Sequence, residues 1–224
     1  MATNRSIVLA TEHVYHIYNR GVERRHIFTD SREYKRFVDT MTYYQYANPV
    51  IRYSKYLQQP LEVRKNILDD LRSHPKVIDL YAYCLMPNHF HFLIRQQNDK
   101  GISQYLSNIS NSFSKYFNTK HIRVGPLLQG TFKAVLIETD NELLHVSRYI
   151  HINPVASLVI AIEKLDQYPW SSFSDYLGKT LCPVTTTTPV LSHFSSSQTY
   201  REFVYDQVAY AQTLEKIKHL TFEE

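Results

Sequence analysis

Residues 77–95 have the sequence VIDLYAYCLMPNHFHFLIR, two apolar runs separated by Met86-Pro87-Asn88. Each run has the length and the aromatic and branched residues of a β-strand, and Pro-Asn is a typical turn pair. The stretch therefore predicts a β-hairpin with strands at 77–85 and 89–95. Because an isolated hairpin is only marginally stable in water, further elements must pack around this one.

The elements on either side of the hairpin follow a split βαβ order. Alternating side chains predict a strand at 13–19, and Asp30 followed by Glu33 indicates the start of a helix. Apolar residues at helical spacing predict a long helix over 102–117, and a further strand is expected at 132–138. The order βαββαβ predicts an α+β fold of the ferredoxin-like type, an antiparallel sheet with helices on one face.

Two helical segments lie outside this core pattern. Pro60 can open a helix rich in leucine, which we interpret as part of a helical insertion at about 43–76. Residues 141–153 predict a helix near the end of the domain, which Pro154 should stop or kink.

The chain of 224 residues is long enough for one large domain with an appendage. We expect the domain over residues 1–177, then a polar linker and helical extension over 178–224, including a helix at 199–218. Residues 1–175 carry 21 basic and 16 acidic side chains, whereas 176–224 carry 4 and 5. The net charge of +4 thus belongs to the first part, and a mildly basic domain is compatible with a nucleic-acid partner.

Composition also bears on the compartment and on excluded classes of protein. The cysteines Cys84 and Cys182 lie far apart, and no apolar run approaches the ~20 residues of a membrane span. We therefore expect a cytoplasmic protein with reduced thiols and no membrane partner. The chain has 18 tyrosines and only 5 glycines, which argues against a Gly-rich phosphate-loop protein. Most of these tyrosines are expected to pack in cores or to stack on bases.

The hairpin contains a histidine pair, His89 and His91, separated by one residue. On a strand, such side chains leave the same face about 7 Å apart, so both imidazoles can converge on one cation. Two solvent-facing strand histidines without a ligand are the simpler interpretation of this motif alone.

The helix predicted over 141–153 carries a polar row of His145, Tyr149 and Asn153, each one turn after the last. A phenol can attack an electrophile, and an amide oxygen can ligate a metal or orient a water. The alternative is that Tyr149 is one more packing residue in a tyrosine-rich chain.

Several motifs, taken together and in order, resemble a known family. They are similar to the motifs of the single-tyrosine HUH transposases, and in particular to those of the REP-associated tyrosine transposases, which are domesticated relatives of insertion-sequence transposases. The resemblance extends from residue 12 to about 177. The motifs are HVYHIYNRG (13–21), LMPNHFHFLI (85–94), GPLLQGTFK (125–133), RYIHINPV (148–155) and YPWSS (168–172).

This resemblance implies an active site and a reaction. Tyr149 would be the nucleophile, and His89, His91 and Asn153 would bind a divalent cation, Mg²⁺ or Mn²⁺. The implied reaction is metal-dependent cleavage and rejoining of single-stranded DNA through a 5′-phosphotyrosine intermediate. The implied partner is single-stranded DNA that contains an imperfect hairpin, and either a monomer or a homodimer fits the family. Members often have Trp and Arg where this chain has Leu128 and Thr131.

Basic and amide side chains near the motifs are candidates for contacts with DNA phosphates. The alternative for each is a solvated surface charge. The candidates are Arg20, Arg24, Arg25, Lys115, Lys120, Arg123, Gln129 and Lys133.

Two other functions stay open at this point. One is a non-catalytic protein that binds hairpins of single-stranded DNA or RNA. The other is a metal-dependent nuclease that uses water as the nucleophile and His89, His91 and His145 as ligands.

Overall fold

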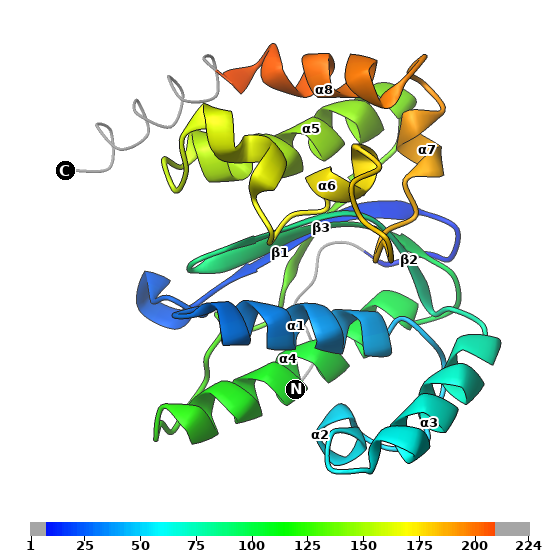
Figure 1. Cartoon of the computed structure of the whole chain (residues 1–224), viewed down its shortest axis with the longest axis vertical. Coiled ribbons are helices and arrows are strands. Elements are labelled where there is room, and N and C mark those ends of the chain that lie inside the picture. Colours follow the sequence, from blue (N-terminus) through cyan, green and yellow to red (C-terminus); the bar gives the residue numbers. More distant parts are fainter. Residues whose placement is uncertain (1–7, 209–224) are drawn as a thin grey trace. The chain divides into compact units, whose positions relative to one another are not determined.

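The computed structural model describes residues 8–208 and contains the predicted hairpin. Strand β2 (Ile78–Met86) and strand β3 (His89–Gln96) are joined by the turn Pro87-Asn88. They belong to a four-stranded antiparallel sheet in the order β2-β3-β1-β4, with β1 at Val14–Arg20 and β4 at Lys133–Ile137 (Figure 1). This is the strand order of a ferredoxin-like βαββαβ unit, so the predicted fold class is confirmed.

The strands follow the hydrophobic pattern of the sequence. In β1 the buried and half-buried residues alternate, with Tyr15 and Ile17 almost fully buried. In β2 and β3 nearly every residue is buried, which is why their sequences are continuous apolar runs instead of alternating ones.

The chain forms two compact units. The first comprises residues 8–79, 87–89 and 94–136, and the second comprises 80–86, 90–93 and 137–208.

In the first unit, helix α1 (Ser31–Tyr43) and helix α4 (Gly101–Lys120) lie side by side (Figure 1). The rings of Phe37 and Phe113 pack edge to face, with their centres 4.9 Å apart. As predicted, α1 begins at an aspartate cap, because the side chain of Asp30 accepts a hydrogen bond from the Glu33 backbone at 3.0 Å.

The insertion consists of helix α2 (Tyr53–Tyr56) and helix α3 (Leu61–Ser73), and α3 begins directly after Pro60 as predicted. The guanidinium of Arg36 joins this insertion to the helix pair. It lies 4.4 Å from the ring centre of Tyr53 on α2 and 5.3 Å from that of Tyr116 on α4.

The second unit is built around helix α5 (Asp140–Ala156), which starts at a capping box formed by Thr139 and Glu142. Of the two predicted effects of Pro154, to stop or to kink the helix, the first is wrong, because α5 continues to Ala156. Pro154 lies in the last turn, and its own carbonyl accepts hydrogen bonds from residues 159 and 160. A proline so close to the end removes one helical hydrogen bond but leaves only two residues to follow it.

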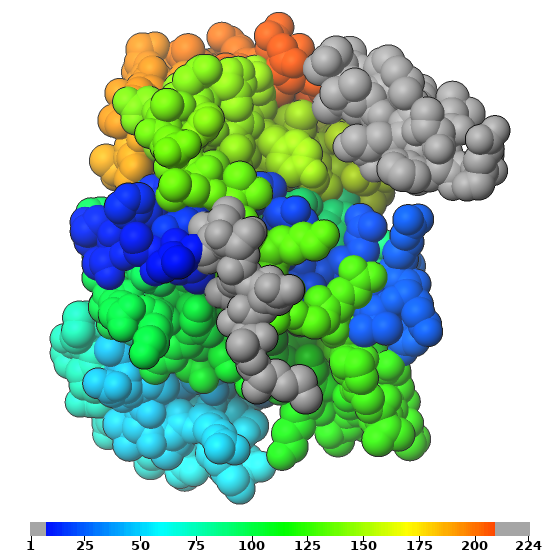
Figure 2. All heavy atoms as spheres, turned by 180° about the vertical axis from the view of Figure 1, so that it is seen from behind, coloured from blue at the N-terminus to red at the C-terminus, as the bar shows by residue number. Residues whose placement is uncertain are grey.

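Shorter elements surround α5. They are the 3-10 helix η2 (Ile162–Gln167), α6 (Phe173–Tyr176), α7 (Thr188–Leu191) and α8 (Ser197–Tyr205). Helix α8 lies along α5 (Figures 1 and 2). It covers the first part of the helix predicted at 199–218, and the part from residue 209 lies outside the described residues. The domain boundary predicted at residue 177 stays a prediction, although α7 and α8 belong to the same compact unit as α5.

Many tyrosines serve the cores, as predicted. The fully buried Tyr15 and Tyr105 lie in the first unit, and Tyr176 and Tyr200 lie in the second. Within residues 8–208, no helix is long and apolar enough to cross a membrane.

Candidate active site

Strand β3 carries both histidines of the His-x-His motif. His89 is its first residue and is half-buried, whereas His91 is only 6% exposed. They are separated by Phe90, which is fully buried, so the alternation of a strand gives the two imidazoles a common face.

The turn before β3 orients His89. Asn88 Nδ2 donates to the carbonyl oxygen of Arg24 at 3.2 Å, which fixes the amide so that Oδ1 points to His89. The Nδ1 atom of His89 lies 2.6 Å from that oxygen, so in the neutral ring Nδ1 carries the proton. The lone pair then lies on Nε2, which suits a metal ligand. Asn88 was missed in the sequence, although its place in the turn beside the histidine was a usable signal.

The backbone segment whose carbonyl accepts the hydrogen bond from Asn88 has an uncommon conformation. Glu23 and Arg24, in the 3-10 helix η1 (Val22–Arg24), have φ of 56° and 57°, in the left-handed region. The backbone of Gly21 donates to the carbonyl of Asn88 at 2.8 Å. The end of β1 and the hairpin turn therefore hold each other through backbone and amide hydrogen bonds.

Helix α5 places Tyr149 against His91. The two ring centres are 5.4 Å apart and the ring planes are at 87°, an edge-to-face contact. Tyr149 is nevertheless 43% exposed, so its phenol is accessible to a ligand. The structure thus brings together two residues, 58 positions apart, that the resemblance assigns to one active site.

Asn153 lies one turn after Tyr149 and is 4% exposed. Its Oδ1 accepts a hydrogen bond from Ser157 Oγ at 3.3 Å, which leaves a second lone pair on this oxygen. An amide oxygen and two imidazoles are donors that a divalent cation accepts together with phosphate oxygens. Among the described residues, no group of three or more His, Cys, Asp or Glu side chains could hold a metal by itself.

His151, inside the motif RYIHINPV, has a different task and was missed in the sequence. It is fully buried, with Nδ1 2.7 Å from Tyr200 Oη and Nε2 2.8 Å from Ser172 Oγ. Burial lowers its pKa to about 3, so the ring is neutral at physiological pH. It joins α5 to α8 and to the serine pair of the motif YPWSS.

His145, the third ligand of the alternative nuclease hypothesis, is engaged on its own helix. Its Nδ1 lies 2.6 Å from Arg148 Nη2, and because a guanidinium only donates, Nδ1 is the acceptor. Arg148 in turn stacks on Phe203 of α8, 4.1 Å from the ring centre. The Nδ1 atom of His145 is therefore already hydrogen-bonded to a cationic side chain.

Two groups of predicted DNA-binding residues meet in the first unit. The backbone of Gln129 donates to the carbonyl of Arg20 at 2.8 Å, and Gly21 pairs with Leu128 in an antiparallel bridge. The loop after residue 126 thus lies against the end of β1, where Arg24 and Arg25 follow. The segments that carry these candidate residues are therefore adjacent, although more than 100 residues separate them in the sequence.

The individual cations differ in their partners. Lys115 is exposed, and Lys133 is exposed with its Nζ 6.0 Å from the ring centre of Tyr18. Arg25 pairs with Glu23 at 3.0 Å, and Arg123 donates to the side chain of Asn118 at 2.7 Å.

Lys120 is the candidate most engaged in the fold. Its Nζ lies 2.7 Å from both Asp30 and the fully buried Glu33, and His121 Nε2 lies 2.6 Å from the same Glu33 carboxylate. Although burial raises the pKa of Glu33, the hydrogen bonds from Lys120 and His121 hold it below its usual range. Lys120 therefore neutralises a buried charge.

A comparison with solved structures finds a protein with the same fold. A solved structure described as "Structure of the REP associates tyrosine transposase bound to a REP hairpin" has the same fold, with a TM-score of 0.52. It is 16% identical to this chain, and the match covers 88% of this chain and 96% of that one. The fold is therefore that of the tyrosine transposases.

The family described as "Transposase IS200 like" matches residues 10–153, well over half of the chain. The chain belongs to this family of DNA transposases. No curated protein matches it.

Proposed function

We propose that this protein cleaves and rejoins single-stranded DNA, with Tyr149 as the nucleophile. The observation that carries the proposal is the edge-to-face contact of Tyr149 with His91, which combines an accessible phenol with a buried imidazole of the His-x-His strand.

In the proposed step, Tyr149 Oη forms a bond to the phosphorus and the bond from phosphorus to the 3′-oxygen breaks. The phenol loses its proton, and the leaving 3′-oxygen takes one up to become a hydroxyl. The product is a 5′-phosphotyrosine, which keeps the phosphoester bond so that a second 3′-hydroxyl can reverse the step. A phenol titrates near pH 10 in water, so attack at neutral pH needs assistance.

His89, His91 and Asn153 would hold the cation, Mg²⁺ or Mn²⁺. When bound, the cation would supply Lewis-acid polarisation of the scissile phosphate. The hydrogen bond from His89 Nδ1 to Asn88 holds the ring in the tautomer that offers Nε2.

The substrate is proposed to be a DNA hairpin with a flanking single strand. The solved relative of the same fold was bound to a REP hairpin, so hairpin DNA is the first substrate to test. The segments that carry Arg20, Arg24, Arg25 and Gln129 adjoin the turn before His89, which suits a strand whose phosphates lead to that histidine.

The test uses a pool of hairpin oligonucleotides with randomised flanks, labelled at the 3′ end because the 5′-phosphotyrosine retains the downstream fragment. After incubation with Mg²⁺ or Mn²⁺, a labelled protein band that resists denaturation should form. It should be lost in Tyr149→Phe and retained in Tyr205→Phe, which removes another partly exposed phenol of the second unit.

The other outcomes are equally informative. Binding of the hairpins without any adduct would show a binding protein and overturn the catalytic proposal. Cleaved DNA without an adduct, unaffected by Tyr149→Phe, would show that water is the nucleophile.

A further inference from the structure

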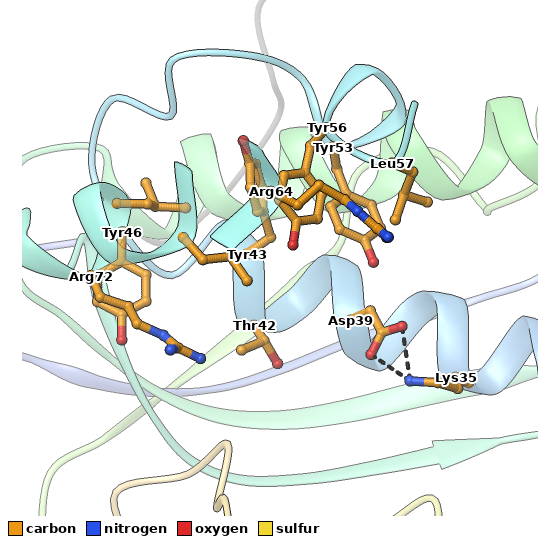
Figure 3. A pocket seen from close by; sticks show the side chains of 12 residues that line it. Lys35, Asp39, Thr42, Tyr43, Tyr46, Tyr53, Tyr56, Leu57, Arg64 and Arg72 are labelled. Carbon is orange, nitrogen blue, oxygen red and sulfur yellow. Dashed lines mark hydrogen bonds and ion pairs between the residues drawn. The ribbon is translucent and has the colours of Figure 1, made fainter. Parts of the chain in front are cut away.

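A pocket of about 420 Å³ lies between α1 and the insertion, entirely within the first unit (Figure 3). Its lining includes residues of α1, α2 and α3, and its volume lies within the range of small-ligand sites, roughly 300–1,000 Å³. Neither the histidines nor Tyr149 contribute to it. The proposed cleavage reaction therefore leaves this pocket without a use.

One wall of the pocket is a preformed cluster of tyrosines. The ring centres of Tyr43 and Tyr53 are 5.2 Å apart, as are those of Tyr43 and Tyr56, and Tyr53 and Tyr56 are stacked at 5.6 Å. Tyr43 donates its hydroxyl to the carbonyl of Ile51 at 2.7 Å, which anchors the cluster to the loop before α2. A ligand would meet an ordered aromatic wall and would not have to order it.

Two hydroxyl groups of this wall are already used within the fold, because Tyr43 donates to the carbonyl of Ile51 and Tyr53 is hydrogen-bonded to the side chain of Asp39. Burial raises the pKa of Tyr43 to about 12 and raises that of Tyr53 as well. Figure 3 shows the hydroxyl ends of Tyr53 and Tyr56 directed toward α1, on the pocket side of the cluster.

The charge of the pocket is positive. Lys35 and Asp39 of α1 neutralise each other at 3.0 Å, whereas Arg64 and Arg72 of α3 add two further cations to the lining. Within the described part of the chain, the buried Nε of Arg64 has no hydrogen-bond partner. Because this Nε is buried, an anion in the pocket would bind Arg64 through its terminal Nη groups.

Apolar groups complete the lining. Leu57, at the end of α2, is 41% exposed, and Leu68 of α3 is half-buried. The pocket thus combines aromatic rings, leucines, the Tyr56 hydroxyl and guanidinium groups. That combination suits a planar, largely apolar ring system that carries a phosphate, because Arg binds phosphate in a fork and aromatic side chains bind bases.

We propose that this pocket binds a nucleoside monophosphate group, with the base against the tyrosines and leucines and the phosphate on Arg64. The group has two sources, a free mononucleotide and an unpaired nucleotide of a DNA strand. The site is distinct from the proposed active site, so the inference does not depend on cleavage.

The test is equilibrium dialysis of the full chain with radiolabelled dAMP, dCMP, dGMP and TMP, and with the matching nucleosides. A mononucleotide should bind at least about tenfold more tightly than its nucleoside, because the nucleoside lacks the charge-assisted hydrogen bonds. Arg64→Gln should weaken mononucleotide binding by about tenfold or more, whereas Lys65→Gln, an exposed neighbour outside the lining, should leave it unchanged. Equal melting temperatures of the two variants would show that the fold is intact.

A second variant leaves the charge of the pocket unchanged, so its effect on binding cannot come from a lost positive charge. Tyr56→Phe keeps the aromatic wall and removes a hydroxyl directed to the pocket side (Figure 3), so it should weaken binding of the mononucleotide and of the nucleoside alike. Inorganic phosphate alone should compete only weakly, since it lacks the ring.

Competition separates the two sources. If single-stranded DNA without a hairpin displaces the mononucleotide, and Arg64→Gln weakens that strand as well, the pocket holds a nucleotide of the substrate. If only the mononucleotide depends on Arg64, the ligand is the free nucleotide. Two results would overturn the proposal. One is that none of the four mononucleotides binds even at a concentration of about 10 mM, roughly the weakest useful affinity. The other is that Arg64→Gln binds them as tightly as the wild type. Tyr149→Phe should bind mononucleotides normally, so failure of the cleavage proposal would be a separate result.

Discussion

His151 Nδ1 lies 2.7 Å from Tyr200 Oη, and this contact ties helix α5, which carries Tyr149, to helix α8 of the C-terminal extension. Tyr200 Oη also donates to Ser147 Oγ at 3.1 Å, and Ser147 donates to the carbonyl of Leu144. The other nitrogen, Nε2, lies 2.8 Å from Ser172 Oγ, which donates to the carbonyl of Tyr83 at 3.2 Å. Both ring nitrogens of the buried His151 are therefore engaged.

The first prediction concerns Tyr200. Replacement by phenylalanine keeps the fully buried ring but leaves His151 Nδ1 without its hydrogen-bond partner. An unsatisfied buried polar group costs about 1–3 kcal/mol, and we expect Tyr200→Phe to lower the free energy of unfolding by that amount. Urea unfolding measures it. Tyr205→Phe, whose hydroxyl bonds the partly exposed Asp166, should cost less than Tyr200→Phe, and an equal loss in both would contradict the account.

The second prediction concerns the pH dependence of stability. The folded pKa of His151 is about 3, below the value of about 6.5 for an unfolded histidine. Between these values the unfolded chain binds a proton that the folded chain does not, so this residue makes stability fall as pH decreases below about 6.5. The expected slope is about 1.4 kcal/mol per pH unit. Above that pH, His151 contributes no slope.

The measurement compares unfolding at pH 7.5 and pH 5 in the wild-type protein and in His151→Gln. The variant should lose roughly 2 kcal/mol less than the wild type between these pH values. Burial also lowers the pKa of His16 to about 4, and its contribution cancels in the comparison. Identical pH profiles of the two proteins would show that His151 is not held neutral in the folded state.

The third prediction separates two lysines that the sequence treats alike. Lys120 neutralises the buried Glu33, whereas Lys133 is exposed. Lys120→Gln should destabilise the fold by about 1–3 kcal/mol, less than a fully orphaned charge because His121 still contacts Glu33. Lys133→Gln should leave stability within about 0.5 kcal/mol and should weaken DNA binding, with the salt dependence reduced by about one unit of slope.

Chemical unfolding and a salt titration of hairpin binding give both readouts for both variants. If Lys120→Gln instead keeps its stability and loses only DNA affinity, the ion pair with Glu33 is not what this lysine provides.

The fourth prediction concerns Gly21, where β1 meets η1. A Cβ atom here would collide with the carbonyl oxygen of Arg25 and would lie 2.9 Å from Ile27 Cγ2. Gly21→Ala should therefore destabilise the protein by about 2 kcal/mol or more, because the backbone of Arg25 cannot move without breaking the turn. Gly130→Ala is the matched control, since this glycine has φ +53° but open space, and should cost only about 1 kcal/mol. Thermal or urea unfolding that ranks the two in the opposite order would contradict this.

The core of the fold was predictable because its signals are local. The runs on either side of Pro87-Asn88 are strands in any context that buries them, and the Asp30 cap operates within four residues. Pro154 was a poor guide to the end of α5, because a proline breaks a helix only where several helical residues would follow it. The order of the strands in the sheet followed from the βαββαβ order of elements along the sequence.

The site was predictable only in part because its contacts are distant in sequence. The His-x-His spacing singled out His91, but nothing local indicates that His91 meets Tyr149 or that His151 is buried against Tyr200. Likewise, the partner of Lys120 lies 87 residues earlier, at Glu33, so its role could not be read from neighbouring residues.

The last prediction concerns Asn88, which holds the His89 ring through Nδ1. If His89 binds the cation through Nε2, loss of this second contact should weaken the apparent affinity for Mn²⁺ by about 10- to 100-fold, while Tyr149 and His91 are untouched. We therefore expect Asn88→Ala to need more Mn²⁺ for half-maximal adduct formation, with the yield restored at saturating metal. Asn88→Asp keeps an acceptor for Nδ1 and should retain most of the affinity. A lower yield at every Mn²⁺ concentration, with an unchanged midpoint, would mean that Asn88 acts on the fold of the turn and not on the metal ligand.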